Sequence, residues 1–267
     1  MDSNRVAYMA GFFDGEGCIK FTVDPRNGYE GIELDIRQTT PEPLQLYAEL
    51  FGGTVYRNSQ VRGKLPSWAY RTNRGDRVGA ILSTLMPYLI VKREKGLQAL
   101  QFLADRRGIE TEYNEEICSE DIILYCAGFF DAEGSVSVRL RCDAQCPQGR
   151  LTPQVRLTQT VVEPLVVFQK QFDGYVKLQS ATTQKGSPIY HYMLKSSQIP
   201  YFCETIEPHL IVKRKVVRLL QQMHSIRLNN GGGDPRFAEK LRLSQEIILS
   251  NCNKGNKSKS IVLQMIA

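Results

Sequence analysis

The sequence lacks an apolar run long enough to span a lipid bilayer, which takes about 20 residues in a helix. Its seven cysteines are odd in number and are not spaced as zinc ligands are. We therefore expect reduced thiols rather than a disulfide framework or a zinc site. Neither a signal peptide nor an Arg-rich leader is recognisable near the N-terminus. These absences predict an intracellular protein with no membrane partner, and leave an organelle and a prokaryotic cytoplasm equally open.

The composition is that of a globular, basic protein. Apolar residues make up 42% of the 267 residues, which is enough for one large or two ordinary domains. The formal net charge is +6. A positive charge suits a polyanionic partner, but many basic proteins bind nothing acidic, so the charge alone does not identify one.

A ten-residue segment occurs twice. Residues 8–17 read Tyr-Met-Ala-Gly-Phe-Phe-Asp-Gly-Glu-Gly, and residues 125–134 read Tyr-Cys-Ala-Gly-Phe-Phe-Asp-Ala-Glu-Gly. The run Leu-Ile-Val-Lys-Arg also recurs, at residues 89–93 and 210–214. The sequence therefore predicts two copies of one unit. We expect a first lobe over residues 1–106, a polar linker over 107–120, a second lobe over 121–228 and a C-terminal extension over 229–267.

Each copy of the repeated segment is predicted to be a buried helix. The segment is apolar almost all round and is followed by a glycine at which a helix would stop. Small residues recur four positions apart and so share one helical face, where two backbones can approach closely. These residues are Gly11 with Gly15, and Gly128 with Ala132. We expect the two helices to pair through this face.

Glu16 and Glu133 fall in the last turn of these helices, so pairing the helices brings two carboxylates together. The helix dipole is negative at that end, and two like charges raise one another's pKa. A divalent cation with hard oxygen ligands, Mg²⁺ above all, would offset both effects. The alternative is that both residues are ordinary helix-end residues that face solvent.

Alternating apolar and polar residues follow each repeated segment and predict strands. In the first copy we expect strands over about residues 19–23 and 32–37, a helix over 41–51 that Thr40 and Pro41 begin, strands over 54–58 and 67–72, and helices over 76–85 and 92–105. The second copy repeats this order, with four extra residues in its first hairpin. Each lobe is thus an αββαββα unit with a four-stranded antiparallel sheet, and a further helix is expected over residues 235–250.

One face of each predicted sheet is apolar and should lie on helices, whereas the other is polar. A two-stranded ribbon fits the major groove of DNA, where Arg reads guanine or holds phosphate and Glu or Asp accepts from cytosine. The residues predicted to contact DNA are Lys20, Thr22, Glu33, Asp35, Arg37, Ser135, Ser137, Arg139, Arg141, Arg156, Thr158 and Lys177. The alternative is a sheet face that is exposed to solvent alone.

The repeated segments resemble the two motifs of single-chain LAGLIDADG homing endonucleases, and the resemblance covers roughly residues 4–228. It implies an α+β fold of two pseudo-symmetric lobes whose sheets form a DNA-binding saddle. It also implies a monomer that cuts both strands of a long asymmetric DNA target in intron homing, with Mg²⁺ as cofactor; Ca²⁺ or Mn²⁺ substitutes in crystals.

The resemblance also implies roles for particular residues. The metal ligands would be the carboxylates of Glu16 and Glu133 with the backbone carbonyls of Gly15 and Ala132, while Asp14 and Asp131 would be structural. Solvent near the metal would be oriented by Gln38 and Gln159, and the basic residues of the catalytic pocket would be Lys92 and Lys213. The alternatives are amides that end strands and lysines that begin helices in solvent. Glu42 and Glu163 stand where some relatives carry a basic residue, which puts that part of the pocket in doubt.

Two other functions are compatible with the same fold. One is an RNA-binding maturase that assists intron splicing, with or without cleavage, and the other is a transcriptional regulator with a decayed nuclease fold. The presence of both acids disfavours a purely binding role. Residence in an intein is not expected, because the chain ends in Ala267 without a splicing Asn. The sequence identifies neither the target site nor the number of catalytic metals.

Overall fold

The computed structural model describes residues 3–23, 25–26, 28, 30–58, 66–113, 121–143, 146–182, 186–228 and 234–251. The chain divides into two compact units: residues 1–61 and 65–133 form the first, and residues 62–64 and 134–267 form the second. Helix α5 (Ile122–Glu133) therefore groups with the first unit although it carries the second copy of the repeated segment. Within these described ranges, no helix is both long and apolar enough to cross a membrane.

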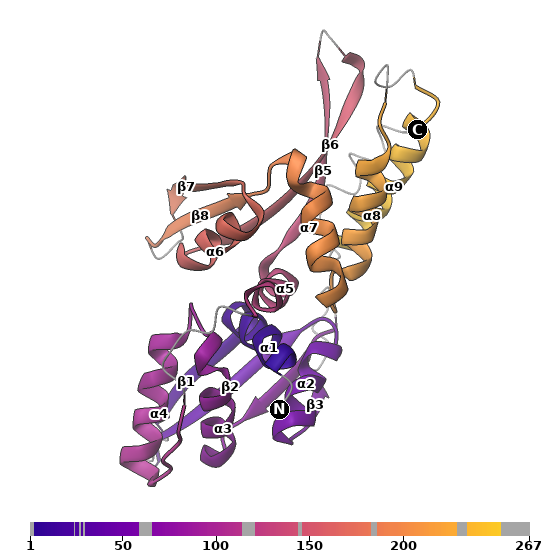
Figure 1. Cartoon of the computed structure of the whole chain (residues 1–267). Coiled ribbons are helices and arrows are strands. Elements are labelled where there is room, and N and C mark those ends of the chain that lie inside the picture. The colour runs from indigo at the N-terminus through magenta and orange to yellow at the C-terminus, as the bar shows by residue number, and fades with distance from the viewer. Residues whose placement is uncertain are drawn as a thin grey trace. The chain divides into compact units, whose positions relative to one another are not determined.

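The first unit contains helices on one side of a four-stranded sheet (Figure 1). Besides α5, its elements are α1 (Ser3–Glu16), β1 (Gly17–Val23), β2 (Glu30–Gln38), α2 (Glu42–Phe51), β3 (Val55–Arg57), β4 (Trp68–Thr72), α3 (Gly75–Leu85), the 3-10 helix η1 (Met86–Tyr88) and α4 (Arg93–Arg107). The strands pair antiparallel in the order β1-β2-β4-β3. Ile32, Leu34 and Ile36 are buried against the helices, as the alternating pattern predicts.

The second unit repeats this topology. Its elements are β5 (Ser135–Asp143), β6 (Cys146–Gln159), α6 (Glu163–Phe172), β7 (Tyr175–Thr182), β8 (Pro188–Met193), η2 (Ser196–Gln198), α7 (Ile199–Ile206), η3 (Glu207–His209), α8 (Arg214–Ser225) and α9 (Phe237–Asn251). The strand order is β5-β6-β8-β7, again antiparallel. The predicted α+β class with two four-stranded sheets is confirmed.

The first hairpin is longer in the second unit than in the first. Strands β1 and β2 pair from Gly17–Ile36 to Val23–Glu30, whereas β5 and β6 pair from Ser135–Arg156 out to Asp143–Cys146. The extra residues in the second copy therefore extend the strands. A register shift after Arg141 interrupts the pairing near the hairpin end.

Helix α9 forms where the sequence predicts a helix in the C-terminal extension. Leu243 and Ile247 are buried, and the helix packs on α8 and β5. Its start is fixed by Asp234, whose Oδ1 accepts the backbone N–H of Arg236 at 2.9 Å and whose carbonyl accepts that of Phe237. The extension is thus part of the packed second unit up to α9.

Two local expectations are wrong. Thr40 does not cap α2; Pro41 occupies the N-cap position, and its carbonyl accepts the backbone N–H groups of the first turn. Phe21 and Val23, predicted to share the buried face with Ile19, are exposed. They lie toward the hairpin end of β1, where the Phe21 ring makes a T-shaped contact with Phe102 on α4, with ring centroids 5.7 Å apart.

Helices α1 and α5 pack with their backbones in contact, as the small residues predict. A Cβ on Gly11 would lie 2.0 Å from the Tyr125 carbonyl oxygen, and a Cβ on Gly128 would lie 1.9 Å from that of Tyr8. Since real Cβ atoms do not approach backbone so closely, only glycine fits at either position. The side chains around these glycines are fully buried aromatic residues, which makes the helix pair the core of the first unit.

The Gly11→Ala substitution tests whether backbone packing or helix propensity determines stability at this position. Propensity alone predicts that alanine stabilises a helix by about 1 kcal/mol relative to glycine. The backbone clash with α5 predicts instead that the free energy of unfolding falls by about 3 kcal/mol. Chemical denaturation measures the difference.

Gly79→Ala on α3 is the matched control, because a Cβ there would meet side chains and no backbone: Thr111 at 3.1 Å, Ile109 at 3.5 Å and Leu103 at 3.7 Å. We expect it to be close to neutral. A Gly11→Ala protein as stable as the Gly79→Ala protein would contradict the packing of α1 on α5.

Candidate functional site

The C-terminal ends of α1 and α5 bring the two predicted metal acids to one place. A Cβ on Gly15 would lie 2.3 Å from Ala132 Cβ and 3.2 Å from Glu133 Cγ. The Glu133 side chain therefore begins next to the residue that precedes Glu16. Both glutamates are half-buried, so two acidic groups share a partly desolvated position at the negative ends of two helices.

Asp14 is a buried anchor for the loop before α4. Its Oδ2 accepts the backbone N–H groups of Ile90 at 2.7 Å and Val91 at 3.0 Å, and its Oδ1 accepts that of Lys92 at 2.8 Å. The Tyr125 hydroxyl of α5 donates to Oδ2 at 2.9 Å. Burial raises the pKa of Asp14, while these N–H donors and the Lys92 charge act in the opposite direction. The arrangement supports the structural role that the resemblance implies.

The tyrosine–aspartate contact is reciprocal between the two helices. The Tyr8 hydroxyl of α1 donates to Asp131 Oδ2 of α5 at 2.7 Å, in the same way as Tyr125 donates to Asp14. Asp131 is fully buried, as is Asp14. Each helix thus satisfies the buried carboxylate of the other, as buried polar groups require.

Lys92 lies beside the acids. Its ammonium group donates to the backbone carbonyl of Asp14 and lies 6.0 Å from the centroid of the Phe13 ring. Burial lowers the pKa of Lys92, whereas the charges of Asp14, Glu133 and Glu16 raise it. A lysine with a lowered pKa releases its proton more readily than an exposed lysine does.

Gln38 contacts one acid directly. Its Nε2 donates to Glu16 Oε1 at 3.4 Å, and its Oε1 accepts the backbone N–H of Thr39 at 2.7 Å. The second contact fixes the amide so that its NH₂ group is directed at the carboxylate. Of the predicted site residues, Glu16, Glu133, Gly15, Ala132, Lys92 and Gln38 are therefore gathered within the first unit.

Gln159 and Lys213 occupy the equivalent local positions in the second unit. Gln159 ends β6, and its Oε1 accepts the next backbone N–H at 3.2 Å, as in Gln38. Lys213 precedes α8 with backbone angles of φ −100° and ψ 10°, close to the −103° and 9° of Lys92 before α4. The repeat is therefore reproduced in local conformation as well as in sequence.

The atoms predicted to bind a cation at the helix ends are all oxygens. The two carboxylates with the backbone carbonyls of Gly15 and Ala132 would form a hard donor set. Within the described ranges, no group of three or more His, Cys, Asp or Glu side chains is arranged to hold a metal ion. A set of two carboxylates matches the way Mg²⁺ is commonly bound, by one or two carboxylates together with substrate phosphates and water.

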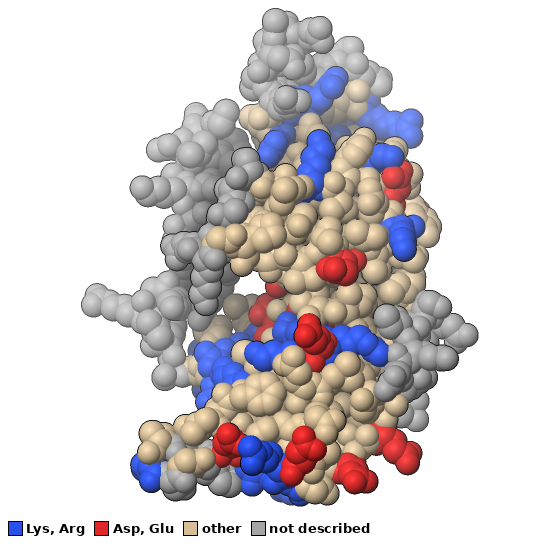
Figure 2. Space-filling view, turned by 90° about the vertical axis from the view of Figure 1, so that its left-hand side faces the viewer, with Lys and Arg blue, Asp and Glu red and all other residues tan. Residues whose placement is uncertain are grey.

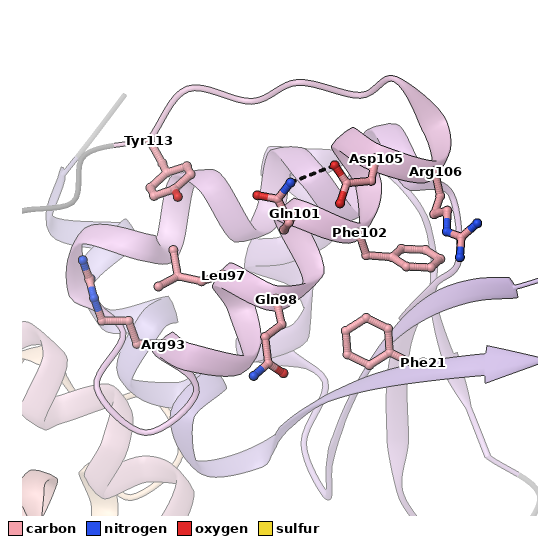
Figure 3. Close-up of a pocket in the computed structure, with 9 residues that line it drawn as sticks. All are labelled: Phe21, Arg93, Leu97, Gln98, Gln101, Phe102, Asp105, Arg106 and Tyr113. Atoms are coloured by element: carbon pink, nitrogen blue, oxygen red, sulfur yellow. Dashed lines mark hydrogen bonds between the residues drawn. The ribbon is translucent and has the colours of Figure 1, made fainter.

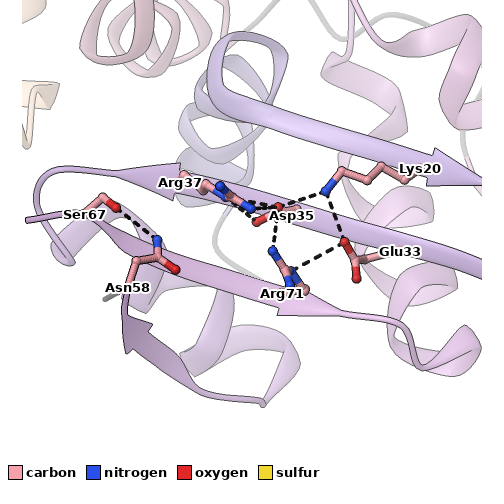
Figure 4. Close-up of polar contacts among 7 residues, drawn as sticks. All are labelled: Lys20, Glu33, Asp35, Arg37, Asn58, Ser67 and Arg71. Carbon is pink, nitrogen blue, oxygen red and sulfur yellow. Dashed lines mark hydrogen bonds and ion pairs between the residues drawn. The ribbon is translucent and has the colours of Figure 1, made fainter. Parts of the chain in front are cut away.

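The open face of the first sheet carries a charge cluster centred on Asp35 (Figure 4). Its Oδ2 accepts from Arg37 Nη2 at 2.8 Å, Lys20 Nζ at 3.0 Å and Arg71 Nη2 at 3.1 Å. Glu33 adds a contact to Lys20 at 3.2 Å and one to Arg71 at 3.5 Å. Three cations thus surround two acids, which leaves the cluster with one positive charge.

Asp35 is 4% exposed, although the alternating pattern predicts it on an open face. The three cations from β1, β2 and β4 cover it, because Asp35 stands opposite Arg71 in the sheet and Lys20 lies diagonally across. Burial alone would raise the pKa of Asp35, but the hydrogen bonds from Arg37, Lys20 and Arg71 lower it to about 2. Thr22, the remaining predicted contact on this sheet, is exposed.

The second sheet presents a matching polar face. Its pairings put most of the predicted residues on one side, since residues directly opposite in antiparallel strands share a face. Those residues are Ser135, Ser137, Arg139, Arg156, Thr158 and Lys177, of which Ser137, Arg139, Arg156 and Lys177 are exposed. The Arg141 side chain lies outside the described part of the chain.

His191 was not predicted from the sequence and lies at the centre of that face. It stands opposite both Thr158 and Lys177, and its Nδ1 lies 2.8 Å from Thr158 Oγ1. Burial and the nearby Arg156 charge lower its pKa. Arg71 was also missed, although the sequence predicts its strand over residues 67–72. The register of β4 against β2, and of β8 against β6, is not evident from sequence.

The surface is not uniformly basic. On the face drawn in Figure 2, Lys and Arg side chains lie interspersed with Asp and Glu side chains. The Asp35 cluster, with three cations and two acids, is one such mixed grouping.

One surface pocket lies away from the acids. An open pocket of about 860 Å³ lies along α4, where Phe21, Phe102 and Tyr113 are interspersed with polar side chains (Figure 3). Gln101 donates to Asp105 there at 2.8 Å. Its lining includes neither Glu16 nor Glu133, so this pocket is separate from the candidate metal site.

Comparison with known proteins identifies the fold. The solved structures that match include the meganuclease I-SmaMI bound to uncleavable DNA, with 16% sequence identity and a TM-score of 0.64 over 90% of this chain and 97% of that one. The LAGLIDADG meganuclease I-AabMI bound to uncleaved DNA matches with 16% identity and a TM-score of 0.61 over 91% and 95%. The LAGLIDADG homing endonuclease I-GzeII in complex with its DNA target matches with 15% identity and a TM-score of 0.60 over 90% and 97%. No protein-family model matches the chain, and neither does any curated protein sequence.

Asp14→Asn tests the anchor before α4. An amide has one acceptor oxygen and would direct its NH₂ group at backbone N–H donors, so we expect the free energy of unfolding to fall by about 2–3 kcal/mol. Tyr125→Phe removes only the hydroxyl donor and should cost about 1 kcal/mol. Urea denaturation measures the free energy of unfolding of both variants. Equal losses in the two variants would contradict the role of the backbone contacts to Asp14.

Asp35→Asn tests the charge cluster through pH. The pKa of Asp35 is about 2 in the folded chain and ordinarily 3.8, so its charge stabilises the fold above about pH 4. That contribution is lost as the pH falls toward 2. We expect Asp35→Asn to be about 2 kcal/mol less stable than wild type at pH 7, with a deficit that shrinks below pH 4. A deficit independent of pH from 7 to 3, measured by denaturation, would contradict the cluster.

Proposed function

We propose that the chain is a site-specific DNA endonuclease that cuts one phosphodiester in each strand of a long asymmetric target, with Mg²⁺ as cofactor. Intron homing by a single chain is the biological role that this activity fits. The observation that carries the proposal is the contact of α1 with α5, which brings Glu16 and Glu133 together beside the half-buried Lys92. The likeness of fold to DNA-bound meganucleases supports it.

Glu16 and Glu133, with the backbone carbonyls of Gly15 and Ala132, would hold the divalent ion. A bound Mg²⁺ would lower the pKa of a water molecule and stabilise the negative charge that develops at phosphorus. Mn²⁺ and Ca²⁺ take the same oxygen ligands. Because the two acids come from two equivalent helices, the arrangement suits two cuts that lie close together.

The chain's own side chains would do the remaining chemistry. Lys92 has a lowered pKa, so its ammonium can release a proton or remain charged beside the scissile phosphate. Gln38 is held by the Thr39 backbone with its NH₂ group toward Glu16, where it can also orient a water molecule. Lys213 and Gln159 are proposed to act in the same way for the second strand.

The polar sheet faces would bind the duplex. Strand β2 has nine residues and is therefore about 30 Å long, which matches about nine base steps. Arg37, Arg139 and Arg156 are exposed and suit contacts with guanine or phosphate. The β5–β6 hairpin extends further than β1–β2, so the two halves of the target need not be equivalent.

Glu16→Gln and Glu133→Gln test the proposal. Each removes one charge without changing the shape of the side chain, and we expect double-strand cleavage to fall by about 10³-fold while duplex binding persists. The substrate is a plasmid library with randomised inserts, from which wild type with Mg²⁺ first selects a cleaved sequence. Linear product on gels and a binding assay on the selected duplex provide the two measurements.

Glu246→Gln is the matched control, because it also removes one glutamate charge but lies on α9, where it pairs with Arg242. It should cleave as wild type does. Wild-type cleavage by either Glu16→Gln or Glu133→Gln would show that the acids are not needed and would overturn the proposed mechanism.

A further inference from the structure

Asp35 is the most enclosed charged group on the polar face of the first sheet. Five contacts converge on its carboxylate, of which Arg37 makes three, through Nε to both oxygens and through Nη2. Lys20 and Arg71 provide the other two, at 3.0 and 3.1 Å. A carboxylate offers about four acceptor sites. Four of these contacts fall on Oδ2 and one on Oδ1, and the Asp35 residue is only 4% exposed beneath the three cations. Asp35 is therefore covered by protein donors and is not placed to read a base, whereas the sequence predicted a base contact.

The three cations around Asp35, in contrast, are partly exposed to solvent. The Lys20, Arg37 and Arg71 side chains are 40%, 55% and 38% exposed. A guanidinium carries five N–H donors, more than these contacts use, and a lysine ammonium carries three. Each cation thus uses some of its N–H donors to bind Asp35 and has other donors directed to the surface, where they can bind a ligand on the sheet.

We propose that Asp35 is a positioning residue that sets DNA selectivity: it fixes Lys20, Arg37 and Arg71 in one geometry and offsets part of their charge. The inference rests on the proposed function and deepens it, since it concerns how the same face distinguishes a target from other DNA. Asp35 itself touches no base.

Two physical effects lead to selectivity. Side chains that are already fixed in the free protein do not have to be ordered on binding, so their fixed donors favour the base pairs that match them. Nonspecific affinity grows with the number of phosphates that cations neutralise. A buried negative charge beneath three cations reduces that attraction for every duplex equally, without removing the donors that recognise bases.

The Asp35→Asn substitution tests both effects through DNA binding, which is measured on the folded protein. The amide keeps the shape but removes the charge and leaves one oxygen as acceptor, so the three cations should loosen and gain effective charge. We expect tighter binding to a fixed duplex of arbitrary sequence, and a plot of log affinity against log salt that is steeper by about 0.9 for each phosphate gained. The ratio of affinities for a duplex selected from a randomised library and for the arbitrary duplex should fall about tenfold.

Asp76→Asn is the matched control. It also removes one negative charge from the first unit, but Asp76 is exposed at the start of α3, where it pairs with Arg74. A general effect of net charge would change both variants equally. We expect the affinity ratio and the salt dependence of Asp76→Asn to equal those of wild type.

Arg71→Lys provides a second test that does not depend on the fold of Asp35→Asn. It keeps the charge but loses the planar fork, so the salt dependence should stay at the wild-type value while the affinity ratio falls. Asp35→Glu restores the charge one methylene further out and should recover the salt dependence of wild type.

The outcomes separate the inference from the proposed function. If wild type selects and cleaves a sequence but Asp35→Asn matches Asp76→Asn, or weakens both duplexes equally, the inference is wrong and the proposed function stands. An unchanged affinity ratio in Arg71→Lys would also overturn it. If wild type selects no sequence from the library, the proposed function fails and the inference fails with it.

Discussion

The contact between α1 and α5 is the constraint on which the rest of the first unit depends. Gly11 and Gly128 have no side chains, so each helix lies with its backbone against that of the other. At this separation the helices also end together, and the Glu133 side chain begins next to Gly15, the residue before Glu16. The same ten residues therefore encode both the buried core and the candidate active site.

The buried polar groups extend this constraint outward. Asp14 is held by Tyr125 from α5 and in turn holds the backbone of the loop before α4. Lys92, which ends that loop, then lies beside the acids with its ammonium on the Asp14 carbonyl. The position of the basic side chain is thus linked to helix pairing, because both depend on the buried Asp14.

The repeated segment made much of this predictable. Its apolar character, its small residues and its terminal acids indicate a buried helix pair, and the alternation after Gly17 indicates the sheet. The burial of Asp35 was not predictable, because it depends on which β4 residue stands opposite, and strand register is not visible in one strand's pattern. Arg71 and His191 were missed for that reason. The exposure of Phe21 depends on how far α4 covers β1, which local sequence does not encode.

The most direct test of the central claim is the anomalous scattering of Mn²⁺ in crystals of the chain on a duplex that it selects. The account predicts a peak at coordination distance from carboxylate oxygens of both Glu16 and Glu133, where the ends of α1 and α5 meet. A peak that contacts neither acid, or two carboxylates directed away from each other, would contradict it.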